Sequence, residues 1–165
     1  MNRNIFLLIF CYSFTVFSQV DKVFIDKSSD GLKLKVNGQD FIVNGMNWDY
    51  FPVGTNYTYS LWQQPENTIQ AALDDEMPLL KNSGVNAIRV YTSIPKKWIE
   101  YIYTNYGIYT MINHPFGRYG LMLNGSWVDH TEYSDAGTRE LLLKEAKQLA
   151  TDYKDTKGLL LFSLV

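Results

Sequence analysis

Short apolar runs alternate with longer stretches of helical period along most of the chain. The apolar runs have the length and the branched-residue content of buried strands. They cover residues 41–46, 85–90, 108–112 and 159–164. The helical stretches place apolar side chains three or four positions apart. They cover residues 68–83, 95–107 and 135–153. Near-continuous apolar strands separated by helices predict a parallel α/β sheet.

Two details of the helical stretches bear on where the helices begin and end. Pro78 interrupts the first stretch, so either a helix begins near Asp75 with Pro78 in its first turn, or a longer helix is kinked at Pro78. Gly84 follows that stretch where a left-handed C-terminal cap is expected.

The last helical stretch has an apolar stripe, formed by Leu142, Ala146, Leu149 and Tyr153.

Residues 22–44 have the pattern of a β-hairpin that precedes the periodic part of the chain. Residues 23–26 and 32–43 are the expected strands, and Ser28 to Gly31 supply a turn. The Asn37-Gly38 pair is a strong hairpin signal, because both residues tolerate positive φ. We expect this hairpin to be a structural cover over one end of the domain.

Polar and aromatic residues are concentrated after the strands, where parallel α/β sheets place their binding sites. The loop at 48–65 is rich in aromatic rings, which either stack on a sugar or pack over the rim of the core. A second long polar and aromatic loop runs from residue 113 to 134. The candidate substrate-binding residues are Trp48, Asp49, Tyr50, Arg89, Tyr91 and His114. His114 is equally compatible with a purely structural role.

Arg89 is the least expected residue of the predicted sheet. It interrupts the apolar run at 85–90, and a guanidinium in a buried strand is costly unless acceptors meet it. We therefore expect a carboxylate or other acceptor near the C-terminal end of that strand. This requirement indicates a site.

The beginning of the chain has the form of a secretory signal. Residues 1–18 combine a short basic start with an apolar core that is too short to span a membrane. We expect a secreted or periplasmic protein, with residues 19–165 as the mature domain. Cys11 is the one cysteine of the sequence, so the mature chain would depend on its hydrophobic core without disulfides.

Composition narrows the chemistry further. The formal net charge is −2 over 165 residues, which gives no indication of nucleic-acid binding. The two histidines, His114 and His130, give poor support for a transition-metal site. A Gly-rich phosphate loop and a nucleophile elbow are both absent from the sequence. No cofactor is expected.

Three segments resemble the opening of the (β/α)8 catalytic barrels of retaining glycoside hydrolases. They are LKVNGQDFIVNGMN at 34–47, LLKNSGVNAIRVY at 79–91 and YGIY at 106–109. The similarity is to the catalytic domain of glycoside hydrolase family 2 and to the related β-1,3-glucanosyltransferases. It implies an incomplete TIM barrel of about four β/α units, because a whole barrel takes about 250 residues.

The resemblance also implies roles for particular residues. Arg89 matches the arginine that supports the nucleophile carboxylate in these families. The general acid/base Glu would follow the strand at 159–164 and the nucleophile Glu would lie on the seventh strand, and neither is within the sequence. Retaining hydrolysis needs two carboxyl groups about 5–5.5 Å apart. No catalytic residue is therefore assigned in this chain.

The resemblance implies the front half of a secreted glycosidase that acts on β-linked glycosides, from a truncated gene model or a damaged gene. We expect the chain alone to be inactive. A non-catalytic carbohydrate-binding half domain that uses Trp48, Tyr50 and Tyr91 is an alternative. A third interpretation is an open, doubly wound secreted domain in which Arg89 pairs internally. An oligosaccharide or polysaccharide is the expected partner, and the pattern favours no particular sugar, linkage or oligomeric state.

Overall fold

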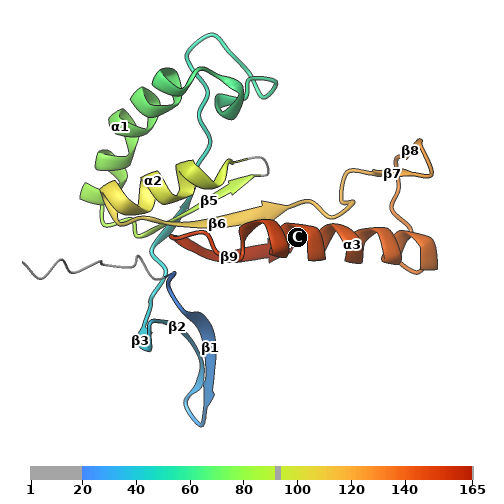
Figure 1. Ribbon diagram of the computed structural model, residues 1–165, viewed down its shortest axis with the longest axis horizontal. Coiled ribbons are helices and arrows are strands. Elements are labelled where there is room, and N and C mark those ends of the chain that lie inside the picture. The colour runs from blue at the N-terminus through green and yellow to red at the C-terminus, as the bar shows by residue number, and fades with distance from the viewer. Residues whose placement is uncertain (1–19, 92–93, 165) are drawn as a thin grey trace, which may run out of the picture.

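The computed structural model describes residues 20–91 and 94–164, and it contains a four-stranded parallel sheet in the order β4-β5-β6-β9. Its strands are β4 (Gly45–Asn47), β5 (Ala87–Tyr91), β6 (Tyr109–His114) and β9 (Leu159–Leu164). The intervening helices are α1 (Glu66–Asn82), α2 (Lys96–Tyr106) and α3 (Ala136–Tyr153). Figure 1 shows α1 and α2 on the same side of β5 and β6. The predicted parallel sheet of β/α units is confirmed.

Two predictions about the beginning of the chain have different outcomes. The signal segment at 1–18, with Cys11, lies outside the described residues. The N-terminal hairpin is present as the antiparallel strands β1 (Val23–Ser28), β2 (Gly31–Val36) and β3 (Gln39–Asp40). Asn37 and Gly38 have φ values of 51° and 82°, as a two-residue hairpin turn with positive φ requires. None of the described helices is long and apolar enough to span a membrane.

The chain between the hairpin and the sheet differs from the prediction. Residues 41–44 were expected to be strand, but β4 begins only at Gly45. The side-chain amide of Asn86 instead makes hydrogen bonds to the backbone of this segment. The backbone N–H of Asn44 donates to Oδ1 of Asn86 at 2.8 Å, and Nδ2 of Asn86 donates to the carbonyl of Ile42 at 2.8 Å. This side-chain amide takes the place of hydrogen bonds between strands. A pattern of apolar residues does not reveal such a bond from a distant side chain.

Helix α1 resolves the alternatives that Pro78 left open. It is one helix from Glu66 to Asn82 with Pro78 inside it. Pro78 has no N–H to donate to the carbonyl four residues earlier, which weakens an isolated helix. The buried side chains of Leu73 and Met77 anchor the helix just before Pro78. Gly84 then adopts a φ of 82° in the expected left-handed cap.

The hydrophobic core lies mainly between the sheet and the first two helices. Ile88 and Val90 of β5 and Ile112 of β6 pack with buried side chains of α1 and α2. A smaller cluster lies between the hairpin and the beginnings of the strands, formed by Val36, Ala87, Tyr109 and Leu160. The hydroxyl of Tyr109 also donates to Oδ2 of Asp21 at 3.1 Å. The hairpin is therefore attached to the N-terminal edge of the sheet.

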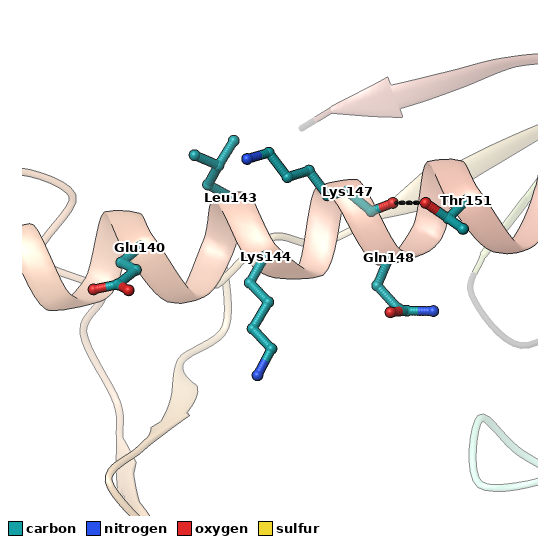
Figure 2. A pocket seen from close by; sticks show the side chains of 6 residues that line it. All are labelled: Glu140, Leu143, Lys144, Lys147, Gln148 and Thr151. Atoms are coloured by element: carbon teal, nitrogen blue, oxygen red, sulfur yellow. Dashed lines mark hydrogen bonds between the residues drawn. The ribbon is translucent and has the colours of Figure 1, made fainter.

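Helix α3 is less covered than the other two helices. Its predicted stripe of Leu142, Ala146, Leu149 and Tyr153 is only half-buried. A hollow of about 500 Å³ runs along the helix and is lined by Glu140, Leu143, Lys144, Lys147, Gln148 and Thr151. In Figure 2 these side chains extend from one helix in different directions. They do not converge on a common point, so this hollow is not a candidate site.

A second hairpin follows β6, where the sequence predicted a long polar and aromatic loop. It consists of β7 (Leu121–Leu123) and β8 (Ser126–Val128), two strands that the prediction did not include. Asn124 and Gly125 form its turn with φ values of 51° and 81°. The Asn-Gly pair is the same signal that identified the first hairpin, and it was available in the sequence.

One carboxylate between α1 and α2 is expected to make the stability of the fold depend on pH. Oδ1 of Asp74 accepts hydrogen bonds from the hydroxyls of Tyr101, at 2.6 Å, and of Tyr106. These hydrogen bonds lower the pKa of Asp74 below its ordinary value, and the bond from Tyr101 has the largest effect. The stabilisation is therefore present above the unfolded pKa of about 4, and it is lost as the pH falls through the lower folded pKa.

Urea unfolding between pH 7 and pH 2.5 tests this expectation. Asp74→Asn should reduce the fall in the free energy of unfolding at acid pH, because Asn does not ionise. Asp75→Asn is the matched control, since Asp75 is exposed and makes no side-chain hydrogen bond within residues 20–91 and 94–164. If the free energy of unfolding of the two variants falls equally at acid pH, the pH dependence does not come from Asp74.

Candidate functional site

Five polar side chains share one face of the sheet near the C-terminal ends of the strands. The register pairs Asn47 with Arg89, Tyr91 with Asn113, and Asn113 with Ser163. Residues paired in parallel strands point to the same side, and successive residues alternate. Because Ile88, Val90 and Ile112 face the helices, the alternate residues face away from them. We call this set the polar face: Asn47, Arg89, Tyr91, Asn113 and Ser163.

Arg89 lies in the polar face, where the expected acceptor is a tyrosine hydroxyl and not a carboxylate. Its Nη2 donates to Oη of Tyr91 at 3.3 Å, and the guanidinium carbon lies 5.6 Å from the centre of the Tyr91 ring. Its Nε is buried and has no hydrogen-bond partner among the described residues. The ion pairs within residues 20–91 and 94–164 are Lys35–Asp40, Lys97–Glu66 and Lys154–Asp155. Internal pairing of Arg89 with a carboxylate is therefore not found in the described chain.

Trp48 is a core residue in this structure. Only 6% of it is exposed, and its ring centre lies 5.9 Å from that of Trp62. Its indole Nε1 donates to Oε2 of Glu76 at 2.6 Å. Trp48 follows Asn47, so the alternation along the strand turns it toward α1 and away from the polar face. Sugar contact by Trp48 stays a prediction, and most of the indole is already occupied by packing.

A small cavity brings together three of the predicted residues, Trp48, Asp49 and Tyr91. Its volume is about 110 Å³, and Tyr59, Ser60, Leu61, Trp62 and Val90 complete its lining. Ligand sites for small molecules are typically about 300–1,000 Å³. The cavity by itself therefore has room for only part of a sugar. Tyr50 lies beside this region, half-buried, with its ring 6.4 Å from that of Tyr59.

His114 is placed apart from Arg89. It follows Asn113 in β6, and its register partner is Leu164, so it belongs to the opposite side of the sheet from the polar face. Its Nδ1 accepts a hydrogen bond from the backbone N–H of Phe116 at 3.1 Å. This bond supports a turn in which Phe116 has a φ of 41°. The observed contacts of His114 are structural.

Asn113, Asn47 and Ser163 belong to the polar face but were not singled out from the sequence. The predicted strand ended at Ile112, so Asn113 was assigned to a loop, whereas β6 continues to His114. Asn113 is only 6% exposed, and its Oδ1 is buried without a hydrogen-bond partner. Counting alternate positions from Arg89 and Tyr91 along an aligned neighbouring strand would have found it.

The described residues contain no cluster of three or more His, Cys, Asp or Glu side chains placed to hold a metal ion. The polar face itself carries one permanent positive charge, amide and hydroxyl groups, and no carboxyl group. These groups can bind and orient a polar ligand or a carboxylate. They do not include the acid and nucleophile that retaining glycoside hydrolysis requires.

No protein-family model and no curated protein matches the sequence. Three solved structures of one enzyme from Amycolatopsis orientalis resemble the fold, each with a TM-score of 0.53. The first is exo-chitosanase CsxA, with 18% identity over 86% of this chain and 15% of that chain. The second, at 17% identity and with the same coverage, is a variant in complex with PNP-β-D-glucosamine.

The third structure concerns inhibition of the exo-β-D-glucosaminidase CsxA by glucosamine-configured castanospermine and an amino-australine analogue. It is 18% identical over 87% of this chain and 15% of that chain. The chain thus spans about 15% of the length of the enzyme that it matches. At this identity, the similarity shows a shared fold with one portion of that glycosidase.

Proposed function

We propose that this chain supplies the first β/α units, and part of the substrate-binding wall, of a secreted retaining glycosidase that acts on β-linked glycosides. The observation that carries the proposal is Arg89. It is a half-buried guanidinium at the C-terminal end of a parallel strand, and its Nε has no partner in the described chain. Leaving a charge partly desolvated and unpaired costs stability, so selection for a function explains why it is kept.

Three further observations support the proposal. Arg89 and the rest of the polar face lie at the C-terminal end of the sheet, where β/α barrels place their active sites. The segments at 34–47, 79–91 and 106–109 resemble the opening of family 2 catalytic barrels. The fold resembles a portion of an exo-chitosanase.

The role that we assign to this chain is to bind and to orient. The terminal nitrogens of the Arg89 guanidinium would hold the nucleophile carboxylate ionised, because a nearby positive charge lowers the pKa of a carboxyl group, and Nε would remain for the substrate. Tyr91 would hold the guanidinium through the observed bond to its Oη. The two catalytic carboxyl groups would come from outside residues 1–165. The sequence of residues 1–18 supports secretion of the protein.

The test compares the protein that the native host makes with the purified chain of 165 residues. An antibody against a peptide of this chain would isolate the native protein, whose intact mass we expect to be that of a whole barrel of about 250 residues or more. We expect that protein to release p-nitrophenol from PNP-β-glycosides, and the chain alone to show no turnover.

Two results would contradict the proposal. Site-dependent turnover by the purified chain would show that its own residues suffice for the chemistry. A native mass equal to that of the mature short chain would remove the source of the catalytic carboxyl groups. The second result would favour the alternative function, a non-catalytic carbohydrate-binding domain built on the polar face.

A further inference from the structure

We infer that Asn113 is a substrate-binding residue of the polar face, and that its side chain accepts a hydrogen bond from a hydroxyl group of a sugar. The inference deepens the proposed function and rests on it. It also makes Arg89 and Asn113 a matched pair, one donating and one accepting, for a neutral polyhydroxylated ring.

The first observation is the state of the Asn113 side chain. The residue is 94% buried, since only 6% of it is exposed, and Oδ1 has no hydrogen-bond partner in the described chain. A buried amide oxygen without a partner is unfavourable, and native proteins seldom retain one without a reason. A ligand hydroxyl would satisfy it once rotation about the Cβ–Cγ bond brings Oδ1 out of its buried position.

The second observation is where Asn113 lies. It is the register partner of Tyr91 on one side and of Ser163 on the other, in the middle of the polar face. Arg89 lies on the same face of the neighbouring strand, two residues before Tyr91. Asn113 therefore belongs to the same site as Arg89.

The two unpartnered atoms have opposite hydrogen-bonding character, which restricts the ligand. Nε of Arg89 is a donor and Oδ1 of Asn113 is an acceptor. A phosphate dianion or a carboxylate only accepts, so it would leave Oδ1 of Asn113 unsatisfied. An ammonium group only donates, so it would leave Nε of Arg89 unsatisfied. Hydroxyl groups both donate and accept, and neighbouring hydroxyls on a sugar ring can satisfy both atoms.

Thr110 offers a matched control on the same strand. Its Oγ1 is also buried without a partner, and the residue is 0% exposed. Its register partner is Ile88, which faces the helices, so Thr110 lies on the side opposite to the polar face. A general effect of removing an unsatisfied polar atom from β6 will appear in both variants, whereas an effect on the ligand will appear only at Asn113.

The experiment is an NMR titration of the complete chain of 165 residues with methyl β-D-glucopyranoside, PNP-β-D-glucopyranoside and inorganic phosphate. Asn113→Leu keeps a similar volume and removes both hydrogen-bonding groups, and we expect it to weaken binding of the two glycosides at least about tenfold. Thr110→Val should bind both glycosides as the native chain does. The thermal midpoint of Asn113→Leu should be no lower than that of the native chain, because no partner is lost.

A series of monodeoxy methyl β-D-glucopyranosides makes the test specific to one bond. One member should bind the native chain more weakly than the parent glycoside, yet bind Asn113→Leu as the parent does. Arg89→Met serves as the companion variant, and we expect it to weaken glycoside binding as well.

The possible results separate the two proposals. Unchanged affinity in Asn113→Leu with weakened binding in Arg89→Met would overturn the role of Asn113 and leave the proposed function standing. Unchanged affinity in both variants would overturn both proposals. No glycoside binding by the native chain would overturn the role of Asn113 and leave the proposed function standing, because that function places only part of the binding wall in this chain. Tighter binding of inorganic phosphate than of either glycoside would overturn the assignment of the ligand as a neutral sugar.

Discussion

Replacing Gly158 by alanine is expected to lower the free energy of unfolding by at least about 3 kcal/mol. Gly158 has a φ of 83°, a conformation that alanine adopts only with strain. A Cβ atom there would also lie 2.3 Å from Cβ and 2.7 Å from Cγ of Tyr103. The carbonyl of Gly158 accepts from the N–H of Thr110 at 2.8 Å, so the residue has little freedom to move away.

Gly107→Ala is the control that separates backbone strain from the steric clash. Gly107 also has a positive φ, of 68°, but a Cβ atom there would meet nothing within 4 Å. This variant should lose only about 1 kcal/mol, the typical strain of alanine in the left-handed region. Urea unfolding of both variants gives the comparison. Equal losses would show that the contact with Tyr103 relaxes freely and would contradict the larger figure.

Replacing Trp48 by alanine is expected to cost about 3–5 kcal/mol, the range for deleting a buried aromatic side chain. The residue is 6% exposed, packs on Trp62 and donates to Glu76 at 2.6 Å. Loss of sugar binding in this variant would therefore follow from loss of the fold. Trp48→Phe, which keeps an aromatic ring in the core, is the variant with which to test the predicted sugar contact.

Trp127→Ala provides the matched control for Trp48. Trp127 belongs to β8 and is 58% exposed, so its removal should change the free energy of unfolding by less than about 1 kcal/mol. Chemical denaturation followed by far-UV circular dichroism reports both variants. A loss at Trp127 as large as that at Trp48 would show that the exposed indole carries packing that its exposure does not indicate.

The features that sequence reasoning predicted correctly depend on neighbours in the chain. Helix α2 begins after Pro95 and ends before Gly107, whose φ of 68° completes the cap. Asn37 and Gly38 form their turn as expected, because the preference for positive φ is a property of those two residues themselves. The alternation of apolar strands with amphipathic helices was sufficient for the parallel sheet.

The incorrect or open predictions involve partners that are distant in the sequence. Residues 41–44 do not form a strand, because Asn86 bonds to their backbone from 42 to 44 positions away. Pro78 stays within α1 because buried packing of that helix outweighs the missing hydrogen bond. The second hairpin is the exception, since its Asn124-Gly125 turn was visible locally.

The candidate site shows the same division at the level of single residues. The amino-acid order alone sets the fold class, the strand in which Arg89 lies and the edge of the sheet to which polar residues belong. It leaves open which face each residue takes, because a shift of one position in a strand turns a side chain to the other side. Folding places Trp48 and His114 on one side and Arg89 and Asn113 on the other. Register depends on contacts between strands that are 20 or more residues apart, so the polar face emerges only when the strands are aligned.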